Sequence, residues 1–151
     1  MYLSELNKVI NGVIYGDVLI DKIKTNSKDI KSGDLFLAIN KGHDYINEAI
    51  DNGAVAIICE NNIKDIPHIK VKSSIEALGK IANYLRNKYN IPLIAITGSV
   101  GKTTTKELIS LVLSKKYKVL KSIKNNNNHI GLPLSLLNLD DTYEVIVAEL
   151  G

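Results

Sequence analysis

Residues 91–107 read IPLIAITGSVGKTTTKE, an apolar stretch that runs into a glycine-containing turn and then into lysines and threonines. The apolar part, 91–97, has the composition and length of a buried strand, and the residues from about Lys102 to Ser114 predict a helix. This helix is expected to bury Leu108, Ile109, Leu111 and Val112. A strand, a glycine turn and a helix in this order form a backbone unit that binds phosphate groups.

The glycine turn has the chemistry that a nucleotide phosphate needs. Glycines let several backbone N–H groups point at one anion, and the start of the following helix adds the positive end of its dipole. The ammonium of Lys102 is spaced to reach the β- and γ-phosphates, and the hydroxyl of Thr103 to ligate Mg²⁺. The general pattern G-x-x-x-x-G-K-[ST] is only partly met, because Ile96 occupies the first glycine position and Gly98 lies two positions later. The expected ATP-binding residues are Gly98, Ser99, Val100, Gly101, Lys102, Thr103 and Thr104.

A second strand is predicted where the sequence reads VIVAE, at residues 145–149. The interval between Thr103 and Glu149 is long enough to hold a helix, a strand near 118–120 and a second helix near 130–137. A carboxylate at the end of a neighbouring strand is a suitable second ligand for magnesium. We therefore expect Thr103 and Glu149 to bind the metal, and Lys102 and Glu149 to be the catalytic residues.

The residues before the glycine turn alternate between strand and helix signals. Strand-length apolar runs fall at 18–23, 34–39 and 54–59, and helices are expected at 4–10, with Ser4 as N-cap, at 45–53 and at 73–88. This alternation predicts an α/β fold with a largely parallel sheet. Pro92 disfavours helix at the residue before it, which indicates a boundary between two domains, 1–88 and 89–151.

Composition and charge exclude several classes of protein. The net charge of +3, from 19 basic and 16 acidic residues, lacks the basic excess of a nucleic-acid-binding domain. The apolar runs are far shorter than the roughly 18 residues that cross a bilayer, and residues 1–4 do not open a secretory signal. Cys59 is the only cysteine, so no internal disulfide can form. We expect a cytoplasmic protein that binds no nucleic acid and does not insert into membranes; the sequence predicts no oligomeric state.

Three segments resemble the Mur ligases, the ATP-dependent amide-bond-forming enzymes of peptidoglycan synthesis. They are TGSVGKTTTKE at 97–107, NNNNHIGLPLSLL at 125–137 and VIVAELG at 145–151. Earlier in the chain, Ser32-Gly33-Asp34-Leu35-Phe36 and Gly42-His43-Asp44 match two further motifs of the family. Asn26-Ser27-Lys28 occupies the place of the family's Asp-Ser-Arg, and His129 stands where a glutamate is common.

The resemblance implies a multidomain enzyme. Residues 1–88 would be a small α/β domain that binds the UDP-sugar, and residues 89–151 the incomplete beginning of a P-loop, mostly parallel-sheet domain that binds ATP and Mg²⁺. A third domain, which binds the incoming amine, would be absent, and the 151 residues alone are expected to be inactive. The substrate-binding residues that the resemblance implies are Ser27, Lys28, His43, Asn127, Asn128 and His129.

Within the family, the chain most resembles the branch that adds D-alanyl-D-alanine to a UDP-N-acetylmuramoyl-tripeptide through an acyl phosphate. The branch that adds diaminopimelate or lysine to a UDP-muramoyl peptide shares the N-terminal pattern and stays an alternative. Two others are a non-catalytic module that binds a nucleotide or UDP-sugar, and a generic P-loop ATPase, which would leave residues 1–88 unexplained.

Overall fold

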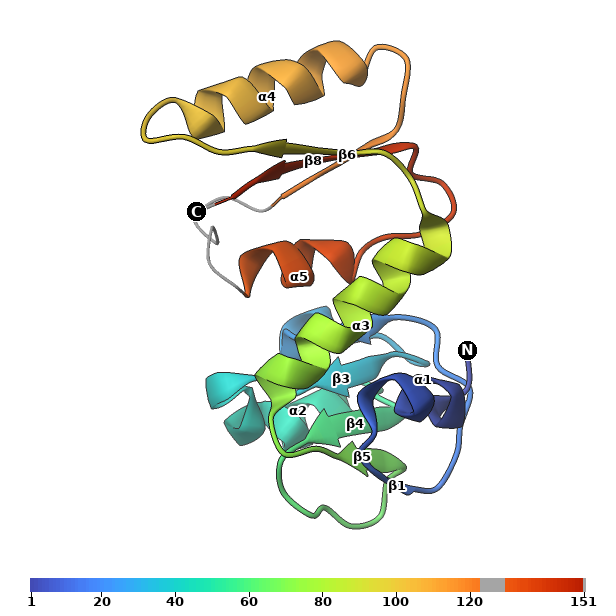
Figure 1. The fold of residues 1–151 in the computed structure, drawn as a ribbon. Helices are drawn as coiled ribbons and strands as arrows, with labels where there is room; N and C mark the ends of the chain where they lie inside the picture. The colour runs from blue at the N-terminus through green and yellow to red at the C-terminus, as the bar shows by residue number, and fades with distance from the viewer. Residues whose placement is uncertain (123–129, 151) are drawn as a thin grey trace. The chain divides into compact units, whose positions relative to one another are not determined.

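The computed structural model describes residues 1–122 and 130–150 (Figure 1). Backbone contacts divide the chain into two compact units, Met1–Ile81 and Ala82–Gly151, which are described separately below as unit 1 and unit 2. The division lies inside helix α3, Ser74–Tyr89, a few residues before the predicted boundary at residue 88. The serine before this helix caps it, because the N–H of Glu76 donates to the hydroxyl of Ser73 at 3.2 Å, as the sequence predicts.

Unit 1 is built on a five-stranded sheet. Its strands lie in the order β1-β5-β4-β3-β2, and every neighbouring pair is parallel except β1 and β5. Their bounds are Val13–Tyr15 (β1), Ile23–Lys24 (β2), Leu35–Leu37 (β3), Ala56–Cys59 (β4) and His68–Lys70 (β5). The prediction of a largely parallel sheet is therefore confirmed for this unit.

Two predictions for the start of unit 1 were wrong. The strand expected at 18–23 is reduced to Ile23–Lys24, because Leu19 instead forms an isolated bridge with Tyr2. Ser4 does not cap α1, Leu3–Ile10; its hydroxyl donates to Asp17 Oδ2 at 2.8 Å. The N–H of Tyr2 is bound instead by Glu5 Oε2 at 2.7 Å, which closes the first turn from inside the helix.

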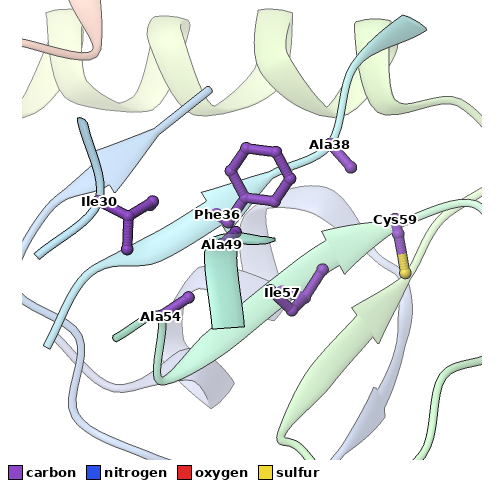
Figure 2. Close-up of a cluster of buried hydrophobic side chains, with 7 residues drawn as sticks. All are labelled: Ile30, Phe36, Ala38, Ala49, Ala54, Ile57 and Cys59. Atoms are coloured by element: carbon purple, nitrogen blue, oxygen red, sulfur yellow. The ribbon is translucent and has the colours of Figure 1, made fainter. Parts of the chain in front are cut away.

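The remaining helical elements of unit 1 are short. They are the 3₁₀ turns η1, Ser27–Asp29, and η2, Asn40–Tyr45, and the helix α2, Ile46–Asp51. Figure 2 shows the apolar cluster that α2 and the strands bury between them. Its buried members are Ile30, Phe36, Ala38, Ala49, Ala54, Ile57 and Cys59. Burial raises the pKa of the Cys59 thiol, which packs as a small apolar side chain, as expected.

Unit 2 contains, among its described residues, a three-stranded parallel sheet in the order β6-β8-β7. The strands are Leu93–Ile96 (β6), Val119–Lys121 (β7) and Val145–Glu149 (β8). The helix α4, Lys102–Leu113, lies on one face of this sheet and α5, Gly131–Leu136, on the other (Figure 1). A second apolar cluster, which includes Leu120, Leu136 and Ile146, fills the space under α5.

The orientation of α4 differs from the prediction. Leu108, Leu111 and Val112 are 58%, 61% and 70% exposed, and the buried residues of the helix are Lys106 and Ser110. The prediction was therefore wrong for these three positions, whereas the fourth, Ile109, is half-buried. The helix instead turns Thr103 and Lys106 toward the carboxylate of Glu149 at the end of β8.

No helix in the described part of the chain is both long and apolar enough to cross a membrane.

Candidate functional site

The turn between β6 and α4 has the conformation that its glycines permit. Gly98 and Gly101 have φ angles of 146° and 77°, values that side-chain-bearing residues rarely adopt. The Gly101 turn leads directly into α4, which begins at Lys102. The ammonium of Lys102 donates to the carbonyl of Gly98 at 2.6 Å and so folds back over the turn. The predicted strand, turn and helix are all present, and the start of a helix after a glycine turn is a place where an anion can be bound.

The predicted metal ligands lie together at the ends of their elements. Parallel pairing places Glu149 beside Ile96, the last residue of β6. The hydroxyl of Thr103, in the first turn of α4, donates to both carboxylate oxygens of Glu149, at 3.2 Å and 2.9 Å. Glu149 is 5% exposed, so this carboxylate sits inside the unit next to the glycine turn. Two hard oxygen donors at this position are ligands of the type that Mg²⁺ prefers.

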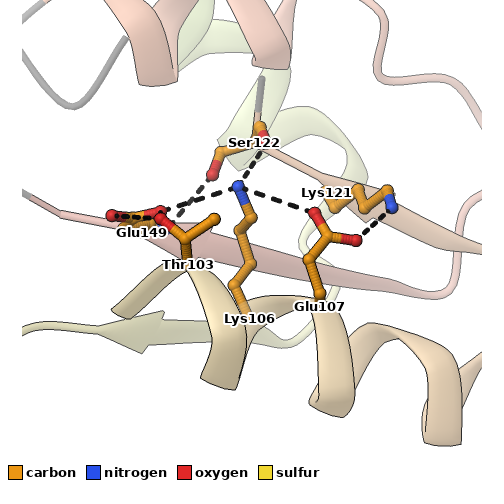
Figure 3. Close-up of polar contacts among 6 residues, drawn as sticks. All are labelled: Thr103, Lys106, Glu107, Lys121, Ser122 and Glu149. Atoms are coloured by element: carbon orange, nitrogen blue, oxygen red, sulfur yellow. Dashed lines mark hydrogen bonds and ion pairs between the residues drawn. The ribbon is translucent and has the colours of Figure 1, made fainter. Parts of the chain in front are cut away.

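Two residues that the sequence reasoning did not assign complete this arrangement (Figure 3). The buried ammonium of Lys106 lies 3.6 Å from Glu149 Oε2 and donates to the carbonyl of Ser122 at 3.2 Å. The hydroxyl of Ser122 accepts the backbone N–H of Glu149 at 3.0 Å. A signal for Lys106 was present, because Thr103, Lys106 and Ser110 are polar residues three and four positions apart, a spacing that places them on one face of the helix. No local pattern marks Ser122.

Part of the predicted substrate site lies in unit 1. A cavity of about 660 Å³ is lined by residues 25–28, by Phe36, by residues 39–42 and by Tyr45. It includes Ser27, which is buried, and Lys28, which is exposed. The N–H of Lys28 donates to Asn26 Oδ1 at 3.1 Å, so the asparagine that replaces the family's aspartate holds the η1 turn.

His43 is close to this cavity in sequence but does not line it. Its Nε2 accepts the N–H of Glu60 at 3.2 Å, and its Nδ1 lies 2.9 Å from the carbonyl of Asn40. Both contacts are satisfied together only by the neutral ring with its proton on Nδ1. The ring therefore connects η2 to the end of β4. The other predicted substrate residues, Asn127, Asn128 and His129, lie outside the described residues.

Comparison with known families and proteins agrees with this geometry. Residues 96–151 match the model of the Mur ligase middle domain. The UDP-N-acetylmuramoyl-tripeptide–D-alanyl-D-alanine ligase of Rickettsia prowazekii is 45% identical in an alignment 145 positions long, which covers 91% of this chain and 32% of that protein. The corresponding ligase of Escherichia coli is 34% identical in an alignment 155 positions long, which covers 99% of this chain and 34% of the relative. The chain thus spans about a third of the length of the curated relatives it matches.

Solved structures give the same result. The chain superposes on MurF from Acinetobacter baumannii with a TM-score of 0.85 and 32% identity, over 98% of this chain and 35% of that one. It superposes on the MurF ligase of Thermotoga maritima in complex with ADP with a TM-score of 0.74 and 38% identity, over 89% of this chain and 33% of the other. From the family match, the sequence identities and the shared fold, the chain belongs to the Mur ligase family.

Proposed function

We propose that the chain is part of an ATP-dependent ligase of peptidoglycan precursor synthesis, which joins D-alanyl-D-alanine to a UDP-N-acetylmuramoyl-tripeptide. The observation that carries this proposal is the contact between Thr103 and Glu149 beside the glycine turn. The reaction is inferred from the relatives of Rickettsia prowazekii and Escherichia coli, which are both named as ligases of this type. Because the chain spans about a third of their length, the 151 residues alone are expected to show no ligase turnover.

The nucleotide would lie on the turn from Gly98 to Thr104. Backbone N–H groups of the turn and the start of α4 would bind the phosphates. Lys102 would exchange its contact with the Gly98 carbonyl for a phosphate oxygen, which places its charge where the transferred group becomes more negative. The relative from Thermotoga maritima was solved in complex with ADP, which supports an adenine nucleotide as the ligand.

Thr103 and Glu149 fit a magnesium ion through the chemistry of their oxygens. A bound Mg²⁺ would neutralise phosphate charge during transfer of the γ-phosphate to the substrate carboxylate. The described residues contain no cluster of three or more His, Cys, Asp or Glu side chains able to hold a metal. Thr103 and Glu149 would share the ion with phosphate and water, an arrangement that is usual for Mg²⁺.

We also propose that the two units bind different substrates. Unit 1 would bind the UDP-sugar substrate in the cavity that contains Ser27 and Lys28, and unit 2 would form the beginning of the ATP-binding domain. Lys28 offers a point charge rather than the planar fork of arginine, so it would bind a substrate phosphate through one nitrogen. His43, whose ring contacts the backbone on both sides, would support this region from outside the cavity.

Calorimetric titration tests both assignments. The 151-residue chain is titrated with ATP plus Mg²⁺ and, separately, with UDP-N-acetylmuramoyl-tripeptide, and each titration is repeated with Lys102→Ala. We expect Lys102→Ala to weaken ATP binding at least tenfold and to leave the UDP-sugar titration unchanged. Lys116→Ala, at an exposed lysine beyond the end of α4, is the matched control and should change neither. Nucleotide binding that does not depend on Lys102, or absence of UDP-sugar binding, would contradict the respective assignment.

A further inference from the structure

The ammonium of Lys106 is fully buried, at 0% exposure, in the second turn of α4. Burying a charged amine is unfavourable unless it is paired and hydrogen-bonded. Replacing a buried ion pair by apolar residues of similar size is often neutral or stabilising, so stability alone does not explain a lysine at this position. The contacts of its ammonium indicate what the charge does.

Those contacts join the ends of two strands to one helix (Figure 3). Lys106 Nζ donates to the carbonyl of Ser122, the residue after β7, at 3.2 Å. The same nitrogen lies 3.6 Å from Glu149 Oε2, at the end of β8, and 4.0 Å from Glu107 Oε1 on its own helix. The ammonium is therefore the point at which α4, β7 and β8 meet.

The carboxylate of Glu149 is held on the α4 side by a hydroxyl and an ammonium. Thr103 and Lys106 are three residues apart, so they lie on the same face of the helix. The Thr103 hydroxyl is 2.9 Å from Glu149 Oε2, the oxygen that Lys106 also approaches. The backbone N–H of Glu149 is bound by the Ser122 hydroxyl, whose own carbonyl Lys106 binds. Position and orientation of the carboxylate are thus both tied to Lys106.

We propose that Lys106 is a positioning residue, which fixes the carboxylate of Glu149 in the orientation needed to ligate the metal ion of the nucleotide. This inference rests on the proposed function, because it takes Glu149 as a ligand of the metal ion. It assigns no contact between Lys106 and the nucleotide. Groups that orient a metal ligand from behind contribute about 10- to 100-fold to metal affinity. Lys106 supplies this orientation from the helix whose first turn carries the other ligand, Thr103.

The test is the metal-dependent part of nucleotide affinity, measured by calorimetry on the 151-residue chain as the ratio of ATP dissociation constants without and with Mg²⁺. In Lys106→Met, which keeps most of the length of the side chain but removes the charge, we expect this ratio to fall at least tenfold. Affinity for ATP without the metal should change less than twofold. The double variant Lys106→Met/Glu149→Gln should lose no more than Glu149→Gln alone, because both changes act on the same ligand.

Lys121→Met is the matched control, since Lys121 binds Glu107 at 2.7 Å in the same network but is 52% exposed and does not contact Glu149. In Lys121→Met, the ratio of the ATP dissociation constants without and with Mg²⁺ should stay within twofold of its value in the unaltered chain. An unchanged or increased ratio in Lys106→Met would overturn the inference. Should that variant fail to fold by far-ultraviolet circular dichroism, Lys106→Gln, which retains a donor, decides by the same ratio. Failure of the proposed function is separate: it would appear as ATP binding that Lys102→Ala leaves unchanged.

Discussion

The helices α2 and α4 bury different kinds of side chain against their sheets. In unit 1, Phe36 and Ile57 pack on α2 in an apolar cluster without a charged member. In unit 2, the interface between α4 and the sheet contains Lys106 and Glu149, while Leu111 of the same helix stays 61% exposed. Burial of hydrocarbon stabilises a fold, whereas burial of an ion pair contributes little net stability. The packing of α2 therefore contributes mainly stability, whereas α4 gives up apolar contact and places charge beside the glycine turn; the apolar cluster of unit 2 lies under α5.

The largest expected effect separates the two units by stability. Phe36→Ala should destabilise unit 1 by about 3–5 kcal/mol, because the ring is 0% exposed and its removal leaves a cavity. Leu111→Ala, the matched change on α4, should cost less than about 0.5 kcal/mol. Urea unfolding, with hydrogen exchange of the β3 and β4 segments to identify unit 1, measures both. Equal costs would contradict the contrast between the units.

A smaller effect is expected at His43. His43→Ala removes two contacts to the backbone, and we expect a loss of about 1 kcal/mol in the stability of unit 1. The exposed neighbour Lys41 provides the control, since Lys41→Ala should leave stability within about 0.5 kcal/mol of the original. Calorimetry with the UDP-sugar distinguishes a role in binding. Weaker binding without loss of stability would show that the ring acts on the substrate, as the family resemblance implies.

The buried thiol of unit 1 gives a pH-dependent prediction. Because burial raises the pKa of Cys59 above that of the unfolded chain, its stabilising contribution is full below the unfolded pKa and is lost as the pH rises through the folded pKa. We expect the chain to lose more stability than Cys59→Ala between about pH 8 and pH 10.5. Urea midpoints across this range measure the difference. Parallel curves for the two proteins would contradict the prediction.

The smallest effect is expected at the surface of unit 1. The pKa of Asp17 is lowered by hydrogen bonds from the backbone and the hydroxyl of Ser4. A carboxyl with a lowered folded pKa stabilises the fold above its unfolded pKa, and this contribution is lost as the pH falls through the folded pKa. Asp17→Asn should therefore lose less stability than the original chain between about pH 5 and pH 2. The measurement is the midpoint of thermal unfolding of both proteins as the pH is lowered. If the bonds to Ser4 had no effect, the midpoint would fall with pH at the same slope in the original chain and in Asp17→Asn.

The local parts of the site were predictable from the sequence. The strand, the glycine turn and the start of α4 follow from consecutive residues, and Glu149 was found because a carboxylate ends an apolar run. Lys106 was missed as a functional residue, because its partners Ser122 and Glu149 are distant in sequence and meet it only after the sheet has formed. Helical periodicity separated an apolar from a polar face of α4, but it could not tell which one the sheet would take.

Contacts between residues that are distant in sequence also explain the wrong predictions for unit 1. Ser4 has the side chain of an N-cap, but Asp17, far along the chain, binds its hydroxyl. Strand β1, Val13–Tyr15, was not predicted, because three residues carry too little alternation to be recognised without their partner β5. Local propensity identified most elements, and contacts between distant segments decided their bounds and faces.

The order β6-β8-β7 has a consequence for how unit 2 folds during synthesis. Among its described strands, the central one is the last to leave the ribosome, so β6 and β7 have no strand partner until residues 145–149 have emerged. Domains fold as units during translation, and pairing of distant strands is slow. The final residue of β8 is Glu149, so the pairing of β8 with β6 and β7 also brings the carboxylate to Thr103. In a nascent chain, Thr103 and Glu149 therefore come together only when β8 pairs with its neighbours.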